Sequence, residues 1–453
     1  MFTYQDLLKV GDLESNRIDF AKRVVGSHKQ TGLYKTAVIA NQYKAQRNTT
    51  ITQYRKLLYT VTGQAVPDNY SANYKLTSNF FNRFVTQENQ FLLGNGVTWA
   101  QNDTKEKLGD NFDTQLQQAG KYALCGGVSF GFWNLNKLDV FPVTEFAPLF
   151  DEEDGAIKAG VRFWQIDSNK PLRATLYEMD GYTEYIWRKG EQGQVLYDKR
   201  PYVLDIISTE ADGQEIFRGE NYPSFPIVPL WANSEHQSEL VGMRENIDAY
   251  DLIKSGFCNT VDEASMVYWT INNAGGMDDI DLAKFVERMR TMHATLVDED
   301  GASAESHTLE TPYASREAIL ERIEKDLYKD AMALNTDTIA SGATTATQIR
   351  AAYEPLNSKA DDYEYQVIQF IQGILNVAGI QDKPTFTRSY LINVSEEVNT
   401  ILASANYLDA DYVTQKILTI LGDADKVEEV LKAMDENSMD RFLGTEEENE
   451  ING

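Results

Sequence analysis

The stretch of small polar residues "NTDTIASGATTATQIRAAYEPL", from Asn335 to Leu356, is the first candidate for chemistry because it looks like a phosphate-binding loop before a helix. A loop of that kind needs the spacing G-x-x-x-x-G-K-[ST], which offers backbone amides, a lysine and a hydroxyl to the phosphates. Neither this stretch nor "GKY" at Gly120–Tyr122 has that spacing. We therefore expect no nucleotide-hydrolysing site.

Metal and catalytic sites find no support either. No histidine has another His or Cys at the ligand spacing of a zinc site; the histidines are His28, His236, His293 and His307. No G-x-S-x-G motif marks a hydrolase nucleophile, but a Ser-His-Asp arrangement stays open because its members need not be neighbours in sequence. Carboxylates are too numerous for spacing to single out a catalytic pair. We predict that the protein is not an enzyme and has no cofactor, catalytic residue or metal ligand.

The net charge of −27 argues against a protein that holds nucleic acid tightly, because such binding needs lysine and arginine to displace counterions. The charge is uneven, however, and no acidic residue occurs between Asp19 and Asp68. The bases of this run that form a candidate contact patch are Lys22, Arg23, Lys29, Arg47, Arg55 and Lys56. Two interpretations stay open: a patch for DNA or an acidic partner, or a solvated face that meets an acidic neighbouring subunit.

Both helices and strands would position these residues. The predicted fold class is therefore α+β, mainly helical. The first 120 residues show mostly helical spacing of apolar side chains, as in Ser78–Trp99. From about residue 121 to 229, short runs of Val, Ile, Tyr, Phe and Trp between turn residues predict an antiparallel β region. No apolar stretch is long enough to span a bilayer, so we expect no membrane partner.

Long amphipathic helices follow the β region. Two of them, at 235–265 and 313–334, bracket a compact α/β piece at 266–312. The longest pattern begins at 346 and contains Pro355, which predicts a kink because proline removes a ladder hydrogen bond and clashes with the preceding turn. The helices at 235–265 and 313–334 can bury their apolar stripes only against each other and against neighbouring chains. We therefore expect an oligomer.

Three stretches resemble the portal proteins of tailed bacteriophages, in particular the family found in long-tailed phages. The first is a helix that ends in a glycine turn, at Asn79–Trp99. The second, Asn246–Ile271, has the pattern D-x-Y-D-x-x-x-S at Asp248, Tyr250, Asp251 and Ser255. The third is a small-residue loop followed by a long helix, at Ser341–Ile371. Their order and spacing, which cover nearly the whole chain, carry the resemblance.

The resemblance implies a portal fold with two long stem helices, a long kinked helix, a strand-rich wing and a small α/β clip. The implied parts are a wing at 1–234, a first stem helix at 235–265, a clip at 266–312, a second stem helix at 313–334, a tunnel loop at 335–345, a long kinked helix with a returning wing strand at 346–394, and a crown at 395–453. We expect the acidic tail of the crown to be disordered.

The resemblance also implies a function. About twelve copies would form a ring-shaped channel at one capsid vertex, through which double-stranded DNA passes without sequence specificity during packaging and ejection. The large terminase subunit would dock on the ring as a separate motor, and a head-completion or adaptor protein would later replace it. The major capsid protein or a scaffolding protein would contact the ring. The protein would belong to the virion and would assemble in the host cytoplasm.

The tunnel loop is the site that the resemblance singles out, as the part that narrows the channel. Its expected channel-lining residues are Asn335, Thr336, Asp337, Thr338, Ser341, Gly342, Thr344 and Thr345. These side chains are small and include no base that could hold phosphate, which suits a loop that touches moving DNA. Without the resemblance, an ordinary connection between two helices is the simpler interpretation.

Two other functions stay open at this point. One is an oligomeric helical scaffold or adaptor that does not enclose DNA, and the other is a carboxylate-based enzyme in the strand-rich region. Rings with a central hole, seen in purified protein, would distinguish a portal from a scaffold.

Overall fold

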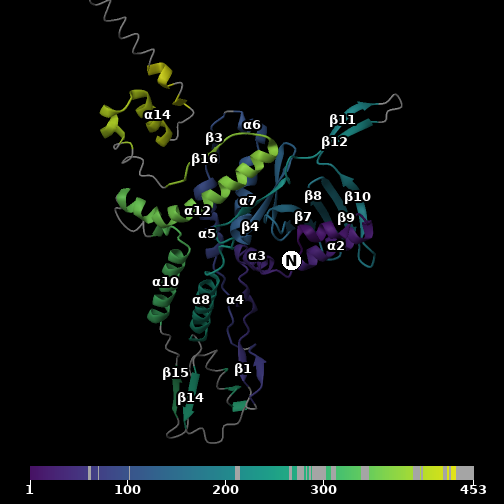
Figure 1. The fold of residues 1–453 in the computed structure, drawn as a ribbon. Coiled ribbons are helices and arrows are strands. Elements are labelled where there is room, and N and C mark those ends of the chain that lie inside the picture. The colour runs from purple at the N-terminus through teal and green to yellow at the C-terminus, as the bar shows by residue number, and fades with distance from the viewer. Residues whose placement is uncertain are drawn as a thin grey trace, which may run out of the picture. The chain divides into compact units, whose positions relative to one another are not determined.

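The computed structural model describes residues 1–59, 63–69, 71–101, 103–209, 215–264, 268–272, 280–281, 283–284, 287, 303–307, 313–337, 346–390, 398, 401–421, 426–427 and 430–434. The chain divides into two compact units, which we describe separately. The first unit comprises Met1–Ala333 and Lys359–Thr387, and the second comprises Leu334–Ser358 and Arg388–Gly453. Both are drawn in Figure 1.

Helices dominate the first part of the first unit (Figure 1). In α5 the side chains of Phe81, Phe84, Val85 and Leu92 are buried at helical spacing, as the sequence pattern predicted. α7 ends at Gly127, whose φ of 86° is the left-handed conformation that glycine adopts at the lowest cost. The helices of this part are α1 (Tyr4–Val10), α2 (Glu14–His28), α3 (Gly32–Lys44), α4 (Thr49–Gln53), α5 (Phe80–Leu93), α6 (Thr104–Leu108) and α7 (Phe112–Gly126).

An antiparallel β region follows, in agreement with the sequence pattern, but it is divided into separate sheets. Five strands pair in the order β10-β9-β8-β7-β6, three pair in the order β13-β4-β5, and β11 pairs with β12. The strands are β4 (Val128–Asn134), β5 (Lys137–Pro142), β6 (Phe146–Phe150), β7 (Ile157–Trp164), β8 (Leu172–Glu178), β9 (Gly181–Trp187), β10 (Gln194–Arg200), β11 (Val203–Thr209), β12 (Glu215–Glu220) and β13 (Ile227–Trp231). α1 and α2 share one apolar core with the five-stranded sheet, in which Phe20 of α2 and Val161 of β7 are both buried.

The long helix α12 (Ala346–Ala378) packs closely against the sheet β13-β4-β5. Two glycines allow this approach. A Cβ on Gly131 of β4 would lie 2.4 Å from the ring of Phe370, and a Cβ on Gly373 of α12 would lie 2.6 Å from Val228. After α12, the short strand β16 (Pro384–Phe386) returns to pair with β3 (Val97–Trp99).

Two further helices lie side by side, with their upper ends in the core of the first unit (Figure 1). α8 (Arg244–Ala264) begins later than the expected residue 235, because a turn at Gly242, with φ of 87°, precedes it. α10 (Tyr313–Asp330) ends before the expected residue 334, because Met332 has φ of 52° and cannot continue a right-handed helix. Between these helices, β14 (Tyr268–Asn272) pairs antiparallel with β15 (Ser303–His307).

The segment from Asn48 to Ser78, which we call the strap, is mostly extended. This differs from the expectation that the first 120 residues are mostly helical. The strap contains the short helix α4 and a hairpin of β1 (Leu57–Tyr59) and β2 (Ala65–Pro67), and it then runs along α8. Near the end of the strap, the backbone amides of Tyr74, Leu76 and Ser78 bond to side chains of α8, a preference that no local pattern reveals.

The second unit contains the first part of α12, the 3-10 turn η1 (Ala405–Tyr407) and α14 (Ala410–Leu421). Within it, the side chains of Arg388 and Tyr390 both donate to the side-chain oxygen of Asn357, over 3.1 and 2.7 Å. The acidic tail after residue 434 lies outside the described residues. None of the described helices is long and apolar enough to cross a membrane.

Candidate functional site

The expected tunnel loop is described only at its beginning. Asn335, Thr336 and Asp337 follow α10, and the side-chain oxygen of Asn335 accepts a hydrogen bond from the amide of Asp337 over 3.0 Å. The other predicted channel-lining residues lie outside the described residues: Thr338, Ser341, Gly342, Thr344 and Thr345. α12 is continuous through Pro355, and the kink there stays a prediction.

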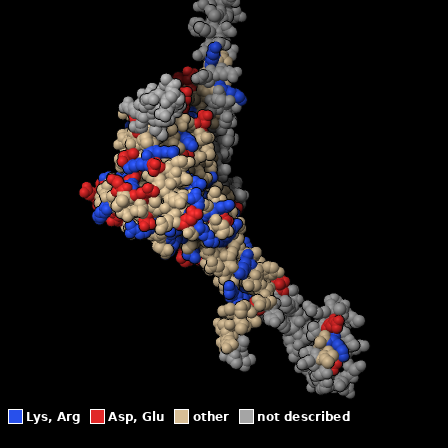
Figure 2. Space-filling model, turned by 90° about the vertical axis from the view of Figure 1, so that its right-hand side faces the viewer, with Lys and Arg blue, Asp and Glu red and all other residues tan. Residues whose placement is uncertain are grey.

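The bases of the candidate contact patch fall in two places in the first unit. Lys22 and Arg23 are exposed on α2, and Lys29 follows α2 with its ammonium 5.3 Å from the centre of the Phe163 ring. Arg47 directly precedes the strap, and Arg55 and Lys56 lie on it. Figure 2 shows basic residues on both of these surfaces. The sequence run is therefore continuous, but its surface is divided.

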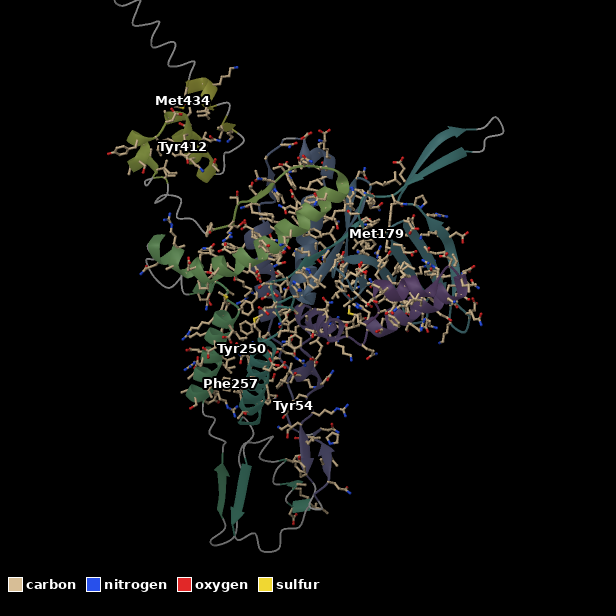
Figure 3. The ribbon with its side chains drawn as sticks, in the orientation of Figure 1. Tyr54, Met179, Tyr250, Phe257, Tyr412 and Met434 are labelled. Atoms are coloured by element: carbon tan, nitrogen blue, oxygen red, sulfur yellow. The ribbon has the colours of Figure 1, made fainter. Side chains whose placement is uncertain are left out.

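α8 and α10 are joined by polar and aromatic contacts along their length. The rings of Phe257 and Tyr313 meet edge to face at 5.6 Å, and Figure 3 shows Phe257 on the α10 side of α8. Arg316 donates to the hydroxyl of Thr260 over 2.7 Å, and Asn246 donates to Asp330 over 3.0 Å. These contacts make the two helices one antiparallel pair.

The residues of the pattern D-x-Y-D-x-x-x-S attach the strap to α8. Asp251 accepts hydrogen bonds from the amide of Ser78 over 2.8 Å and from the side chain of Asn48 over 2.5 Å. One turn further, the hydroxyl of Ser255 accepts from the amide of Leu76 over 2.9 Å. The spacing of the motif therefore has a structural reason, because residues four apart on a helix share a face.

Of the two other members of the pattern, Asp248 also binds the strap and Tyr250 contacts α5. Asp248 accepts from the hydroxyl of Thr50 over 2.7 Å, and the ring of Tyr250 meets that of Phe80 edge to face at 5.0 Å. Burial raises the pKa of Asp251, although its two strap donors oppose the shift. The carboxylates hold backbone and amide donors, so their role is to position the strap.

A buried ion cluster lies where the α8–α10 pair meets the rest of the first unit. Its centre is Lys359 of α12, whose ammonium nitrogen lies 2.8 Å from Glu88 Oε2 of α5 and 2.5 Å from Glu239 Oε2. The ammonium also donates to the carbonyl of Ala331 over 3.2 Å. Glu239 shortly precedes α8 and Ala331 directly follows α10, so one ammonium connects both helices to α5 and α12.

Hydrogen bonds around the cluster fix the same part of α12. The Tyr363 hydroxyl donates to Asn89 Oδ1 over 3.0 Å, and Asp362 accepts from the amide of Ser234 over 2.9 Å. Gly120 of α7 makes room for the first of these bonds, because a Cβ there would lie 2.1 Å from the Tyr363 hydroxyl oxygen.

The protonation of the cluster follows from its burial. Two carboxylates face one ammonium, and Glu88 is the more deeply buried of the two. Burial raises the pKa of Glu88 to about 8, although Lys359 opposes the shift. Burial alone would lower the pKa of Lys359, but the two carboxylates raise it above its usual value. Burial therefore favours the protonated form of Glu88, and the carboxylates favour the ammonium form of Lys359.

Sequence reasoning missed this cluster, although a signal for it existed. Glu88 follows Phe84 by four residues and Val85 by three, so it lies on the apolar stripe of α5. A charged residue on such a stripe predicts a buried partner, because an unpaired buried charge is too costly. The identity of the partner has no such signal, since Lys359 is far away in sequence.

The polar clusters of the described residues join elements of the fold. Among the described residues, no group of three or more His, Cys, Asp or Glu side chains could hold a metal ion. In these clusters the polar side chains bind neighbouring elements. Asp251 binds the strap, and Lys359 pairs with Glu88 and Glu239.

Comparison with known proteins identifies relatives of this architecture. The model of a family described as "Phage portal protein, SPP1 Gp6-like" matches residues 35–441. The portal protein of Bacillus phage SPP1 is 25% identical over 394 residues, which are 78% of this chain and 74% of the relative. The portal protein of Clostridium phage phiCD119 is 27% identical over 197 residues, 41% of this chain and less than half (44%) of the relative.

Solved structures show a weaker likeness. The neck of an empty gene transfer agent (GTA) particle, computed with C6 symmetry, contains a chain that is 12% identical, with a TM-score of 0.45. The match covers 76% of this chain and 90% of that one. A chain in the virion of a native GTA particle is 13% identical, with a TM-score of 0.43, and the match covers 75% and 89% of the two chains.

Proposed function

This chain belongs to the SPP1 Gp6-like family of phage portal proteins, and we propose that it forms the ring-shaped channel at one capsid vertex through which DNA is packaged and ejected. The observation that carries the proposal is the family match, which extends over residues 35–441. The antiparallel pair of α8 and α10, followed by the start of a loop of small polar residues, supports the assignment of these helices as the stem.

The net charge of −27 is consistent with a channel through which DNA passes. A surface that is negative on average repels the DNA backbone, so a duplex can pass without being held. The work of translocation then belongs to a separate motor. We propose that the large terminase subunit docks on the clip, within residues 266–312, and that a head-completion or adaptor protein takes its place afterwards.

Electron microscopy of purified protein tests the ring directly. We expect rings of about twelve copies with a central hole, and a matching mass in analytical ultracentrifugation. A monomer or an open filament at concentrations where the protein stays soluble would contradict the proposal and favour the scaffold interpretation. ATP hydrolysis by the purified ring would contradict the assignment of the motor to another protein.

The tunnel loop at 335–345 is proposed as the narrowest part of the channel, on the basis of its position between α10 and α12 and its mostly small side chains, of which only Asp337 is charged. Inserting four glycine–serine residues after Gly342 should reduce the DNA packaged per capsid while rings still assemble. The same insertion after Lys189, in the exposed turn between β9 and β10, serves as the control. Normal packaging with the lengthened loop would exclude a channel role for it.

The remaining assignments follow from family membership and are proposals as well. The wing at 1–234 and the crown at 395–453 would face the capsid, where the major capsid protein or a scaffolding protein is the expected contact. The protein would be part of the virion at the portal vertex after assembly in the host cytoplasm. Cross-linking within purified particles, followed by mass spectrometry, identifies these neighbours.

A further inference from the structure

α8 lies between the strap and α10. Its side chains Asp251 and Ser255 bind the strap, while Phe257 and Thr260 contact α10. Ser255 and Phe257 are two residues apart, which is about 200° around a helix, so the two neighbours occupy opposite sides of α8. Figure 1 shows the same order, with α10, α8 and α4 of the strap side by side.

The strap and α10 also lie at the same height along α8. The amide of Tyr74 in the strap donates to Asn259 Oδ1 over 2.6 Å, and Arg316 of α10 donates to the hydroxyl of Thr260 over 2.7 Å. Asn259 and Thr260 are adjacent residues of α8. Tyr74 and Arg316 therefore contact α8 at the same height along its axis.

The outer surface of the strap carries exposed aromatic and basic side chains. Tyr54 is 42% exposed and Tyr74 is 51% exposed, and each is followed by an exposed base, Arg55 and Lys75. Figure 3 shows Tyr54 on the side of α8 that is away from α10, and Figure 2 views this side of the molecule. Tyrosine and arginine are enriched in protein–protein interfaces, where their large side chains become buried.

The outer face of α10 is complementary to that surface. Because Arg316 points to α8, the residues about half a turn away, Ala314, Ala318 and Glu321, lie on the far side, and all three are exposed. Glu317, also exposed, flanks them. The alanines leave room for aromatic rings, and the two carboxylates have the opposite charge to Arg55 and Lys75.

We propose that the strap of one copy packs, through Tyr54 and Tyr74, against the outer face of α10 in the next copy. The inference rests on the proposed ring, in which every copy presents two different faces to its two neighbours. Repeating the order strap, α8, α10 around a closed ring brings each strap to a neighbouring α10 at the same height. Arg55, which belongs to the basic run, and Lys75, which follows the run, then meet Glu317 and Glu321.

Two charge-reversed variants test this contact. The strap variant is Arg55→Glu with Lys75→Glu, and the α10 variant is Glu317→Lys with Glu321→Lys. Each variant alone places like charges at every contact, so we expect its dissociation constant for assembly to rise about tenfold or more at low salt. In an equal mixture, copies can alternate so that every contact joins opposite charges, and rings should return. Mass photometry measures the assembled fraction, and circular dichroism confirms folding.

The control is Lys170→Glu with Lys189→Glu, on exposed turns of the five-stranded sheet. It changes the net charge as the strap variant does, and it should assemble like the wild type. Wild-type rings together with normal assembly of either charge-reversed variant would overturn the inference and leave the proposed function intact. A mixture that fails to recover rings would also overturn it. If the wild type itself forms no rings, the proposed function fails together with the inference.

Discussion

At the scale of single residues, Lys359 has the largest expected effect on stability. Replacing it with methionine leaves Glu239 and Glu88 without their buried cation. The loss of one partner from a buried ion pair costs about 3–5 kcal/mol, so Lys359→Met should lower the free energy of unfolding by about that amount. Chemical denaturation measures it. The exposed Lys325, which pairs with Glu321 within α10, is the control, and Lys325→Met should cost less than about 1 kcal/mol. Equal losses for the two variants would contradict a special role for the cluster.

The raised pKa of Glu88 predicts how the stability of the fold depends on pH. Its pKa is raised from 4.5 to about 8 in the folded protein, chiefly by burial. The folded state therefore keeps a proton that the unfolded state releases, so the contribution of Glu88 is greatest below pH 4.5 and is lost as pH rises to about 8. Glu88→Gln copies the protonated form and removes this loss. The variant should therefore gain melting temperature relative to the wild type between pH 5 and pH 8.

The control for this pH series is Glu106→Gln, at an exposed position of α6. Its melting temperature should follow that of the wild type at every pH. A constant difference between Glu88→Gln and the wild type from pH 5 to pH 8 would show that Glu88 is already ionised in the folded protein. The protonation assigned to the cluster would then be wrong.

At the scale of elements, the attachment of the strap to α8 is the feature open to test. Asp251→Ala leaves the amide of Ser78 without its acceptor and removes one of the two acceptors of the Asn48 side chain. Each unsatisfied buried donor costs about 1–3 kcal/mol, so the strap should open locally before the rest of the chain unfolds. Hydrogen exchange should become at least about tenfold faster in the strap and stay unchanged in α7. Glu245→Ala, at an exposed position of the same helix, is the control; equal exchange in both variants would contradict the attachment.

The elements also show which parts of the fold could be predicted from sequence. The apolar spacing of Phe81, Phe84 and Val85 lies within one short segment, and it predicted α5. In the same way, short runs of β-branched and aromatic residues between turn residues predicted the β region. The strap lies within the first 120 residues, which were expected to be mostly helical, and its extended form could not be predicted because its partners, Asp251 and Ser255, lie far away in the chain. The ends of α8 and α10 were misplaced for a similar reason, since turns at Gly242 and Met332 override a helical pattern that continues past them.

The candidate site was likewise predictable from the sequence only in part. The D-x-Y-D-x-x-x-S pattern was noted in the sequence, but its purpose became visible only when Ser255 was found to bind the strap. The cluster of Lys359, Glu88 and Glu239 joins three distant segments, so the spacing within α5 could reveal that Glu88 is buried but not which residues are its partners. The tunnel loop was assigned through the resemblance alone, and its role stays a prediction.

At the scale of the whole molecule, the strength of DNA binding distinguishes the two interpretations of the basic run. With a net charge of −27 per copy, the protein should bind free duplex DNA more weakly than the roughly 10⁻⁴–10⁻⁶ M of proteins that hold DNA nonspecifically. Fluorescence anisotropy of a labelled duplex at physiological salt measures this. If the run contacts neighbouring subunits, Arg55→Glu with Lys75→Glu changes assembly and leaves DNA binding at background. Micromolar binding by the wild type that weakens with salt, and that Lys22→Glu with Arg23→Glu abolishes, would instead make the α2 part of the run a DNA surface.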